Sequence, residues 1–195
     1  MAAPSSQTPG AHGPVGRLLE RVTGAFALAG GLLMVAVMMI ESASIIGRGL
    51  ATVLGPILPG LPIGSIPGDT EIVEVGGAVA IFAFLPYCQM TRANVFVDFF
   101  THRLPLRARA ALDLVANLLF LALSVAIAWQ LGHGAYEKWS YGDTTTVLRI
   151  PEAWPYGLSL VSAWLLAIAT AYTVARSFNE ILQDRLIGPH PSMGH

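Results

Sequence analysis

The stretch VTGAFALAGGLLMVAVMMI, residues 22–40, decides the fold of this chain. It contains nineteen residues, of which only Thr23 is polar. An α-helix rises about 1.5 Å per residue, so about 20 apolar residues cross the roughly 30 Å hydrocarbon core of a bilayer. Three further apolar segments follow at Ile72–Cys88, Ala110–Trp129 and Tyr156–Val174. Because backbone polar groups in lipid must be satisfied within the segment, we expect four transmembrane helices.

The composition agrees with a membrane protein. Hydrophobic residues make up 54% of the chain and charged residues only 12%, with a mean hydropathy of +0.61. A typical soluble domain carries about twice that charged fraction. The net charge of −1 gives no reason to expect nucleic acid as a partner. The lone cysteine, Cys88, excludes an internal disulfide, a thiol relay and a cysteine-cluster zinc site.

Lysine and arginine residues predict the orientation in the membrane. If both termini are cytoplasmic, eight of these residues lie inside and three lie outside. Positive residues are retained in the cytoplasm, so both termini and the 89–109 connection are expected there. The alternative is a cleaved signal peptide in place of the first span, because Ser42-Ala43-Ser44 loosely resembles a cleavage site. The apolar stretch is longer than the roughly 7–15 residues of such peptides, which favours a true span.

The predicted fold is an all-α membrane domain over residues 17–182. Residues 1–16 are rich in Pro, Gly and Ser and are predicted to be a disordered cytoplasmic N-terminus, and residues 183–195 a cytoplasmic tail. Between the second and third spans, Asn94 can cap a short cytoplasmic helix that lies in the interface plane. The apolar face of this helix would hold Val95, Phe96, Phe99 and Phe100. The four spans are expected at about 22–42, 71–90, 108–130 and 155–176.

Charged residues near the outer ends of the first two spans leave alternatives open. Glu41 and Arg48 are seven residues apart and share a helix face, where they either face water or anchor a partner subunit. At the start of the second span, Asp69 or Thr70 is expected to be the N-cap and to accept the first free amide protons. Glu71 and Glu74 favour the positive helix end, and the alternative for this pair is catalysis or cation binding.

The third and fourth spans each carry one further feature. Asp113 lies in the third span, four residues after Arg109. It forms a local ion pair, is stabilised by the helix dipole, or bonds to a neighbouring subunit. The fourth span has alanines at strict four-residue spacing, which suits packing within the bundle and an intersubunit seam equally well. These alanines are Ala163, Ala167, Ala171 and Ala175.

Motifs for chemistry are missing from the spans. No histidine lies within a span, so a di-haem anchor would lack its ligand pairs. There is no Walker loop, no HExxH and no GxSxG. No span carries a series of ionisable groups or a mid-span break typical of a transport site. We therefore expect no catalytic residue, no metal and no cofactor, in a small membrane scaffold or accessory subunit. The alternatives are an independent four-helix channel and a stand-alone four-helix anchor of a redox or enzyme complex.

Four motifs follow one another along the chain. They are GRG at 47–49, IPGDTEIVE at 66–74, NVFVDFFTHRLPLRARAALDL at 94–114 and YGDTTTVLRIPEAWPYGL at 141–158. In their order, their spacing and the predicted cytoplasmic termini, the chain resembles the small membrane subunit of tripartite ATP-independent periplasmic (TRAP) transporters, the DctQ-like family. The resemblance covers about residues 17–182. Asn94 stands where the family often has His.

This resemblance implies a transport role without enzymatic activity. In such a transporter a soluble periplasmic binding protein captures an organic acid, and a large membrane subunit moves it by an elevator motion driven by a sodium gradient. The small subunit is expected to brace the large one in the bacterial inner membrane, among its lipids, and to offer part of the outer docking surface. The resemblance does not name the organic acid, because substrate choice belongs to the other two components.

Several residues are candidates for these contacts. Charge at membrane depth without enough partners in its own chain suggests contact with the large subunit or with lipid headgroups. The outer connections 51–70 and 138–155 are expected to help receive the binding protein, with Tyr141 and Asp143 on the docking surface. The candidates for subunit or headgroup contact are Arg48, Glu74, Arg92, Asp98 and Asp113.

Overall fold

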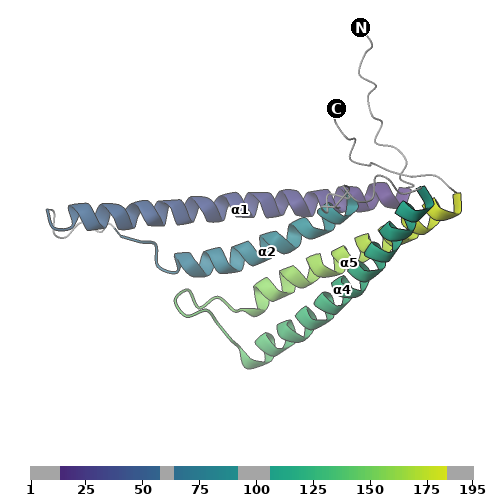
Figure 1. Ribbon diagram of the computed structural model, residues 1–195. Coiled ribbons are helices and arrows are strands. Elements are labelled where there is room, and N and C mark those ends of the chain that lie inside the picture. Colours follow the sequence, from purple (N-terminus) through teal and green to yellow (C-terminus); the bar gives the residue numbers. More distant parts are fainter. Residues whose placement is uncertain (1–13, 58–63, 92–105, 184–195) are drawn as a thin grey trace, which may run out of the picture.

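The computed structural model describes residues 14–57, 64–91 and 106–183. The regular structure of these residues is helical and is shown in Figure 1: α1 (Pro14–Leu54), α2 (Asp69–Met90), α4 (Leu106–Tyr141) and α5 (Ala153–Gln183). All four helices are long and apolar enough to cross a membrane, as predicted. The predicted interfacial helix falls on residues 92–105, which lie outside the described residues, and it stays a prediction.

The helices form an open row. α1 packs against α2, α2 against α5, and α5 against α4, with only slight contact between α1 and α5. Figure 1 shows them close together near the start of α1 and the end of α5, which we call the terminal end. They fan out toward the opposite end, which holds residues 142–152 and which we call the loop end. In such a row every helix keeps a side for lipid or for another protein.

A regular seam joins α1 to α2. The buried residues of α1 recur every seven positions, which is the repeat of helices that wrap around each other. Small residues bring the two backbones together, because a Cβ atom built on Gly76 would lie 2.5 Å from Cγ2 of Val37. A Cβ atom built on Gly77, the next residue, would meet nothing within 4 Å. The buried seam residues of α1 are Gly16, Thr23, Gly30, Val37 and Ser44.

α5 lies in the interior of the row. It packs against both α2 and α4, and its most apolar stretch is more buried than that of any other described helix. The alanine stripe divides accordingly: Ala163 and Ala167 are buried, whereas Ala171 and Ala175 are exposed. Half of the stripe therefore packs within the row, and the other half remains open.

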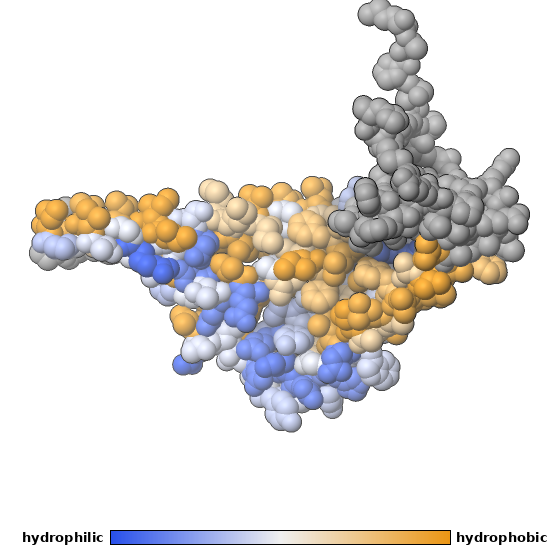
Figure 2. Space-filling view, viewed as in Figure 1, coloured by the Kyte–Doolittle hydropathy of each residue, from blue (hydrophilic) through white to orange (hydrophobic). Residues whose placement is uncertain are grey.

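Three helices, α1, α4 and α5, extend past the spans predicted for them. α1 has 41 residues and is about 60 Å long, and α4 has 36 residues. Figure 2 shows apolar residues over much of the visible helix surface and hydrophilic ones gathered toward the loop end. The polar contacts at that end hold the spread helices at defined positions.

Candidate subunit-contact and docking surfaces

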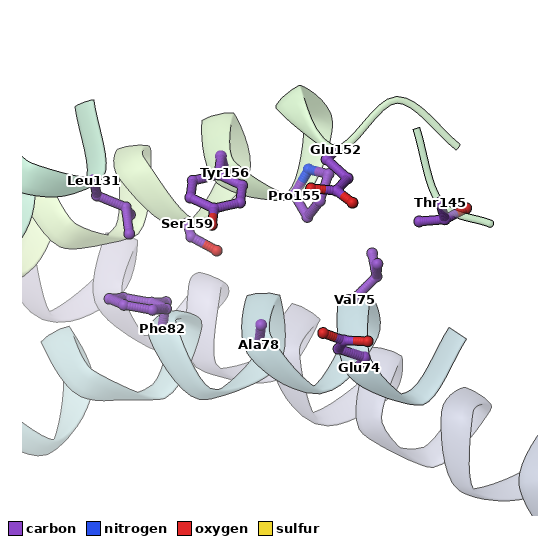
Figure 3. Close-up of a pocket in the computed structure, with 10 residues that line it drawn as sticks. All are labelled: Glu74, Val75, Ala78, Phe82, Leu131, Thr145, Glu152, Pro155, Tyr156 and Ser159. Atoms are coloured by element: carbon purple, nitrogen blue, oxygen red, sulfur yellow. The ribbon is translucent and has the colours of Figure 1, made fainter. Parts of the chain in front are cut away.

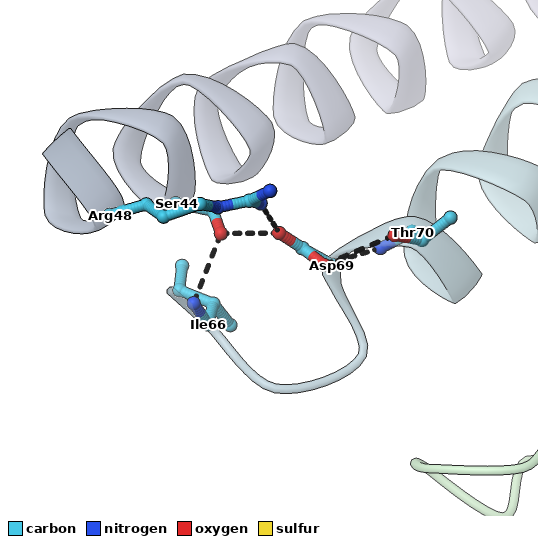
Figure 4. Close-up of polar contacts among 5 residues, drawn as sticks. All are labelled: Ser44, Arg48, Ile66, Asp69 and Thr70. Carbon is cyan, nitrogen blue, oxygen red and sulfur yellow. Dashed lines mark hydrogen bonds and ion pairs between the residues drawn. The ribbon is translucent and has the colours of Figure 1, made fainter. Parts of the chain in front are cut away.

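The first polar cluster fixes the start of α2 to α1 at the loop end (Figure 4). Ser44 donates a hydrogen bond to Oδ2 of Asp69, and Arg48 forms an ion pair with the same oxygen at 2.8 Å. The hydroxyl of Ser44 in turn accepts the backbone amide of Ile66 at 3.0 Å. Asp69 is buried, whereas 61% of the Arg48 side chain is exposed. Arg48 therefore retains a surface for a further partner.

The local sequence explains why α2 begins here. Gly68 takes a left-handed conformation, with φ of 77°, and makes no side-chain capping bond. Asp69 is the first helical residue, and its Oδ1 accepts the backbone amide of Thr70 at 2.8 Å. A carboxylate in the first turn favours the positive end of the helix. Asp69 accepts a free amide as expected, but the N-cap is Gly68 rather than Asp69 or Thr70. The long-range bonds of Asp69 to α1 were not foreseen.

The second cluster joins the connection between α4 and α5 to α2. Residues 142–152 form a narrow turn. The backbone amide of Thr145 donates to the carbonyl of Ile150, and the backbone amide of Glu152 donates to the carbonyl of Asp143, both at 3.0 Å. At its tip, the amides of Val147 and Leu148 donate to the carboxylate of Glu71, at 2.7 and 2.9 Å. The turn is thereby held against the first turn of α2.

A close apolar contact supports this junction. The Leu148 side chain lies against Gly68, where an added Cβ atom would come within 2.5 Å of it. The positive φ of Gly68 also favours glycine, because other residues rarely adopt that conformation. Gly68 thus has two roles: it precedes the first residue of α2, and it leaves room for the Leu148 side chain of the 142–152 turn.

Lys138 in the last turn of α4 closes the base of the same connection. Its ammonium lies 3.0 Å from Asp143 and 2.8 Å from Glu152. A cation at this position also favours the negative end of the helix. Asp143, predicted as a docking residue, is thus already paired within its own chain, while Tyr141 is 78% exposed.

A cleft of about 300 Å³ opens between α2 and α5 (Figure 3). In Figure 3, Glu74 approaches the cleft from α2, and Glu152 lies on the opposite wall. Within the described part of the chain, no group of three or more His, Cys, Asp or Glu is placed to hold a metal ion. The other residues that line the cleft are Val75, Ala78, Phe82, Leu131, Thr145, Pro155, Tyr156 and Ser159.

A third polar cluster lies deeper, toward the terminal end, and connects three helices. The amide nitrogen of Gln89 on α2 donates to Asn117 on α4 and to Thr173 on α5, both at 2.9 Å. Asn117 donates to Ser177 on α5 at 3.2 Å. All four side chains are buried. In lipid, such bonds favour one arrangement of the helices because the alternative leaves polar groups unsatisfied.

The predicted contact residues do not form one cluster. Arg48 is on α1 and pairs with Asp69 of α2, Glu74 lines the cleft, and Asp143 lies at the base of the 142–152 turn. Asp113 is on α4, but its side chain is outside the described residues. Arg92 and Asp98 lie in 92–105, also outside them. These assignments remain predictions.

Several residues of these clusters had no assigned role in the sequence analysis. Gln89 and Thr173 stand in apolar spans, and a buried amide there is a signal that could have been used. Glu71 was interpreted only through the helix dipole, because its partners lie more than 70 residues away. Ser44 was considered only within Ser42-Ala43-Ser44, as a possible cleavage site, and its bond to Asp69 was not foreseen.

The arrangement defines a multi-pass membrane protein whose polar contacts hold helices to one another. The chain matches the family model for "Tripartite ATP-independent periplasmic transporters, DctQ component" over residues 61–180, well over half of its length. Comparisons with curated proteins and with solved structures gave no match. This chain therefore belongs to the DctQ family, the small membrane component of TRAP transporters. The match covers α2, α4 and most of α5, and α1 lies outside it.

Proposed function

We propose that this chain braces the large membrane subunit during sodium-coupled, binding-protein-dependent uptake of an organic acid. The observation that carries the proposal is the open row of helices. Polar contacts join α1 to α2 and α2 to the 142–152 turn at the loop end, and they join α2, α4 and α5 toward the terminal end. Large apolar side chains remain exposed along the helices. A subunit that moves its substrate by an elevator motion needs a fixed neighbour. A row of helices held together by polar contacts, with exposed apolar side chains available for contact, suits that task.

The family supports the partners in this proposal. DctQ proteins are one component of a tripartite system, which also contains a large membrane subunit and a periplasmic binding protein. We place this chain in the inner membrane with both termini in the cytoplasm, on the basis of its arginine and lysine distribution. The loop end then faces the periplasm. The alternative role, as an anchor of a redox or enzyme complex, is not favoured by the family match.

Contact with the large subunit is tested by co-purification. The large subunit carries the affinity tag, and recovery of this chain is compared between wild type and the variants Asp98→Ala and Asp113→Ala. Glu137→Ala is the matched control, because Glu137 is an exposed acid near the loop end of α4. A polar contact between membrane helices contributes about 0.6–2 kcal/mol, so we expect reduced recovery rather than complete loss. Unchanged recovery and unchanged uptake in both variants would refute these contacts.

Docking of the binding protein is a separate part of the proposal. Tyr141 is 78% exposed at the loop end, next to the turn held by Glu71. A photo-crosslinking residue at Tyr141 should capture the binding protein during turnover. If the large subunit crosslinks to the binding protein and Tyr141 never does, this surface is not part of the docking site.

A further inference from the structure

A basic pocket lies at the terminal end, where the end of α2 packs against the start of α1 (Figure 1). It has a volume of about 400 Å³ and is lined by Arg17, Glu20, Arg21, Gly24 and Tyr87. Arg17, Arg21 and Gly24 are spaced by four and three residues, so they share one face of α1. Tyr87 belongs to α2, and its ring lies 3.8 Å from the place that a Cβ atom on Gly24 would occupy. The pocket is therefore formed jointly by both helices.

The pocket carries an excess of positive charge. Its two arginines face a single acid, Glu20, which leaves a net charge of +1. Neither arginine forms an ion pair with a residue that the structure describes, whereas Lys138 at the other end pairs with two acids of its own chain. A guanidinium group presents several N–H donors and binds phosphate through two of them. A phosphate diester, with its single negative charge, therefore complements the pocket.

The pocket lies at the level of the lipid headgroups. Arg21 directly precedes the apolar stretch 22–40. Arg21 and Arg48 are 27 residues apart on α1, about 40 Å, which equals the thickness of a bilayer including its headgroups. Arg48 pairs with Asp69 at the polar start of α2, so Arg21 reaches the headgroups of the opposite leaflet. Tyrosine, here Tyr87, is typical of this level because its ring is apolar and its tip is polar.

The surface next to the pocket suits an acyl chain. On α2, Phe84 lies one turn before Tyr87, and its ring is 4.0 Å from the place that a Cβ atom on Gly31 would occupy. Gly24 and Gly31 are seven residues apart, so both rings lie along the same face of α1. Leu28, between the two glycines, is 68% exposed. An apolar surface thus leads from the pocket into the hydrocarbon region.

We infer that this pocket binds the phosphate group of an anionic phospholipid, such as phosphatidylglycerol. Basic pockets between membrane helices on the cytoplasmic side are typical sites for anionic headgroups. A free phosphate ion has the same chemistry but makes no use of the apolar surface. In the orientation proposed above, the lipid belongs to the cytoplasmic leaflet and connects the start of α1 to the end of α2. This inference goes beyond the proposed function, because it does not require that the chain braces another subunit.

Native mass spectrometry of the purified full-length chain tests this inference. Phosphatidylglycerol and the zwitterionic phosphatidylcholine are added at equal concentrations, and we expect the chain to retain phosphatidylglycerol preferentially. Arg17→Gln and Arg21→Gln should each weaken its binding about fivefold, the contribution of one cation near a membrane surface. Glu20→Gln should strengthen its binding, because the opposing charge is removed. All three substitutions lie outside the predicted spans, so they spare the four-helix row.

Arg149→Gln is the matched control, because Arg149 is an exposed arginine at the loop end, outside the pocket. The inference is wrong if both lipids bind equally, or if Arg149→Gln weakens binding as much as the two pocket variants do. In a separate arm, inorganic phosphate is added and the ionic strength is matched with chloride. Displacement of phosphatidylglycerol by phosphate alone would indicate a site for the free ion and overturn the lipid assignment. Loss of the bound lipid when the large subunit is added would make the pocket a protein contact and would also overturn it.

Discussion

The carboxylate of Glu71 accepts a 2.9 Å hydrogen bond from the backbone amide of Leu148, which lies 77 residues further along the chain. The neighbouring amide of Val147 bonds to the other carboxylate oxygen at 2.7 Å. This pair of bonds connects the first turn of α2 to the connection between α4 and α5. It links the two sides of the cleft at the end where the helices have spread apart.

Loss of one Glu71 oxygen should loosen the 142–152 turn. Glu71→Gln leaves a single carbonyl oxygen, which cannot accept both amides in the same geometry. We expect faster amide hydrogen exchange at Val147 and Leu148 in the purified protein, measured by mass spectrometry. Glu74→Gln is the control, because Glu74 lies one turn further on and faces the cleft. Equal exchange in the two variants would show that Glu71 does not hold the turn.

Gly76 should tolerate a methyl group less well than its neighbour Gly77. A Cβ atom at Gly76 would lie 2.5 Å from Val37, whereas nothing lies within 4 Å of the same atom at Gly77. Overpacking of this kind costs about 1–3 kcal/mol. We therefore expect Gly76→Ala to lower the thermal unfolding midpoint in detergent, while Gly77→Ala leaves it unchanged or raises it through better helix propensity. The reverse order would contradict the described seam between α1 and α2.

Two buried threonines of α5 allow a comparison between a hydrogen bond that joins two helices and one that stays within a helix. Thr173 accepts a hydrogen bond from Gln89 on α2, whereas the hydroxyl of Thr170 bonds to the carbonyl of Leu166 on its own helix. Hydrogen bonds between membrane helices contribute about 0.6–1.7 kcal/mol. Thr173→Val should therefore lower the unfolding midpoint more than Thr170→Val, when both are measured in the same detergent. Equal shifts would mean that the cluster does not tie α2 to α5.

The four helices could be predicted from sequence because lipid leaves few choices. Long apolar segments such as residues 22–40 must form helices, since their backbone groups find no partner in hydrocarbon. Residue type alone does not distinguish Gly76, which lies against Val37 of α1, from Gly77, which faces open space. The order of the helices in the row was not predicted, because exposed and packed apolar faces have the same composition in a membrane.

The polar contacts were less predictable because they depend on distant residues. Arg48 was expected to face water or a partner, and it pairs with Asp69 while most of its side chain stays exposed. Glu71 was interpreted as a helix-end carboxylate, and its bonds to Val147 and Leu148 required the folded turn. In both cases the residue type was informative, and its partner became identifiable only when the helices were assembled.

The most direct test of the bracing role is uptake by reconstituted liposomes. The large subunit is inserted with or without this chain, and uptake of a radiolabelled organic acid captured by the binding protein is measured under a sodium gradient. We predict rapid uptake only when both membrane subunits are present, and none when this chain is inserted alone. Uptake by this chain alone, or equal uptake by the large subunit without it, would contradict the account.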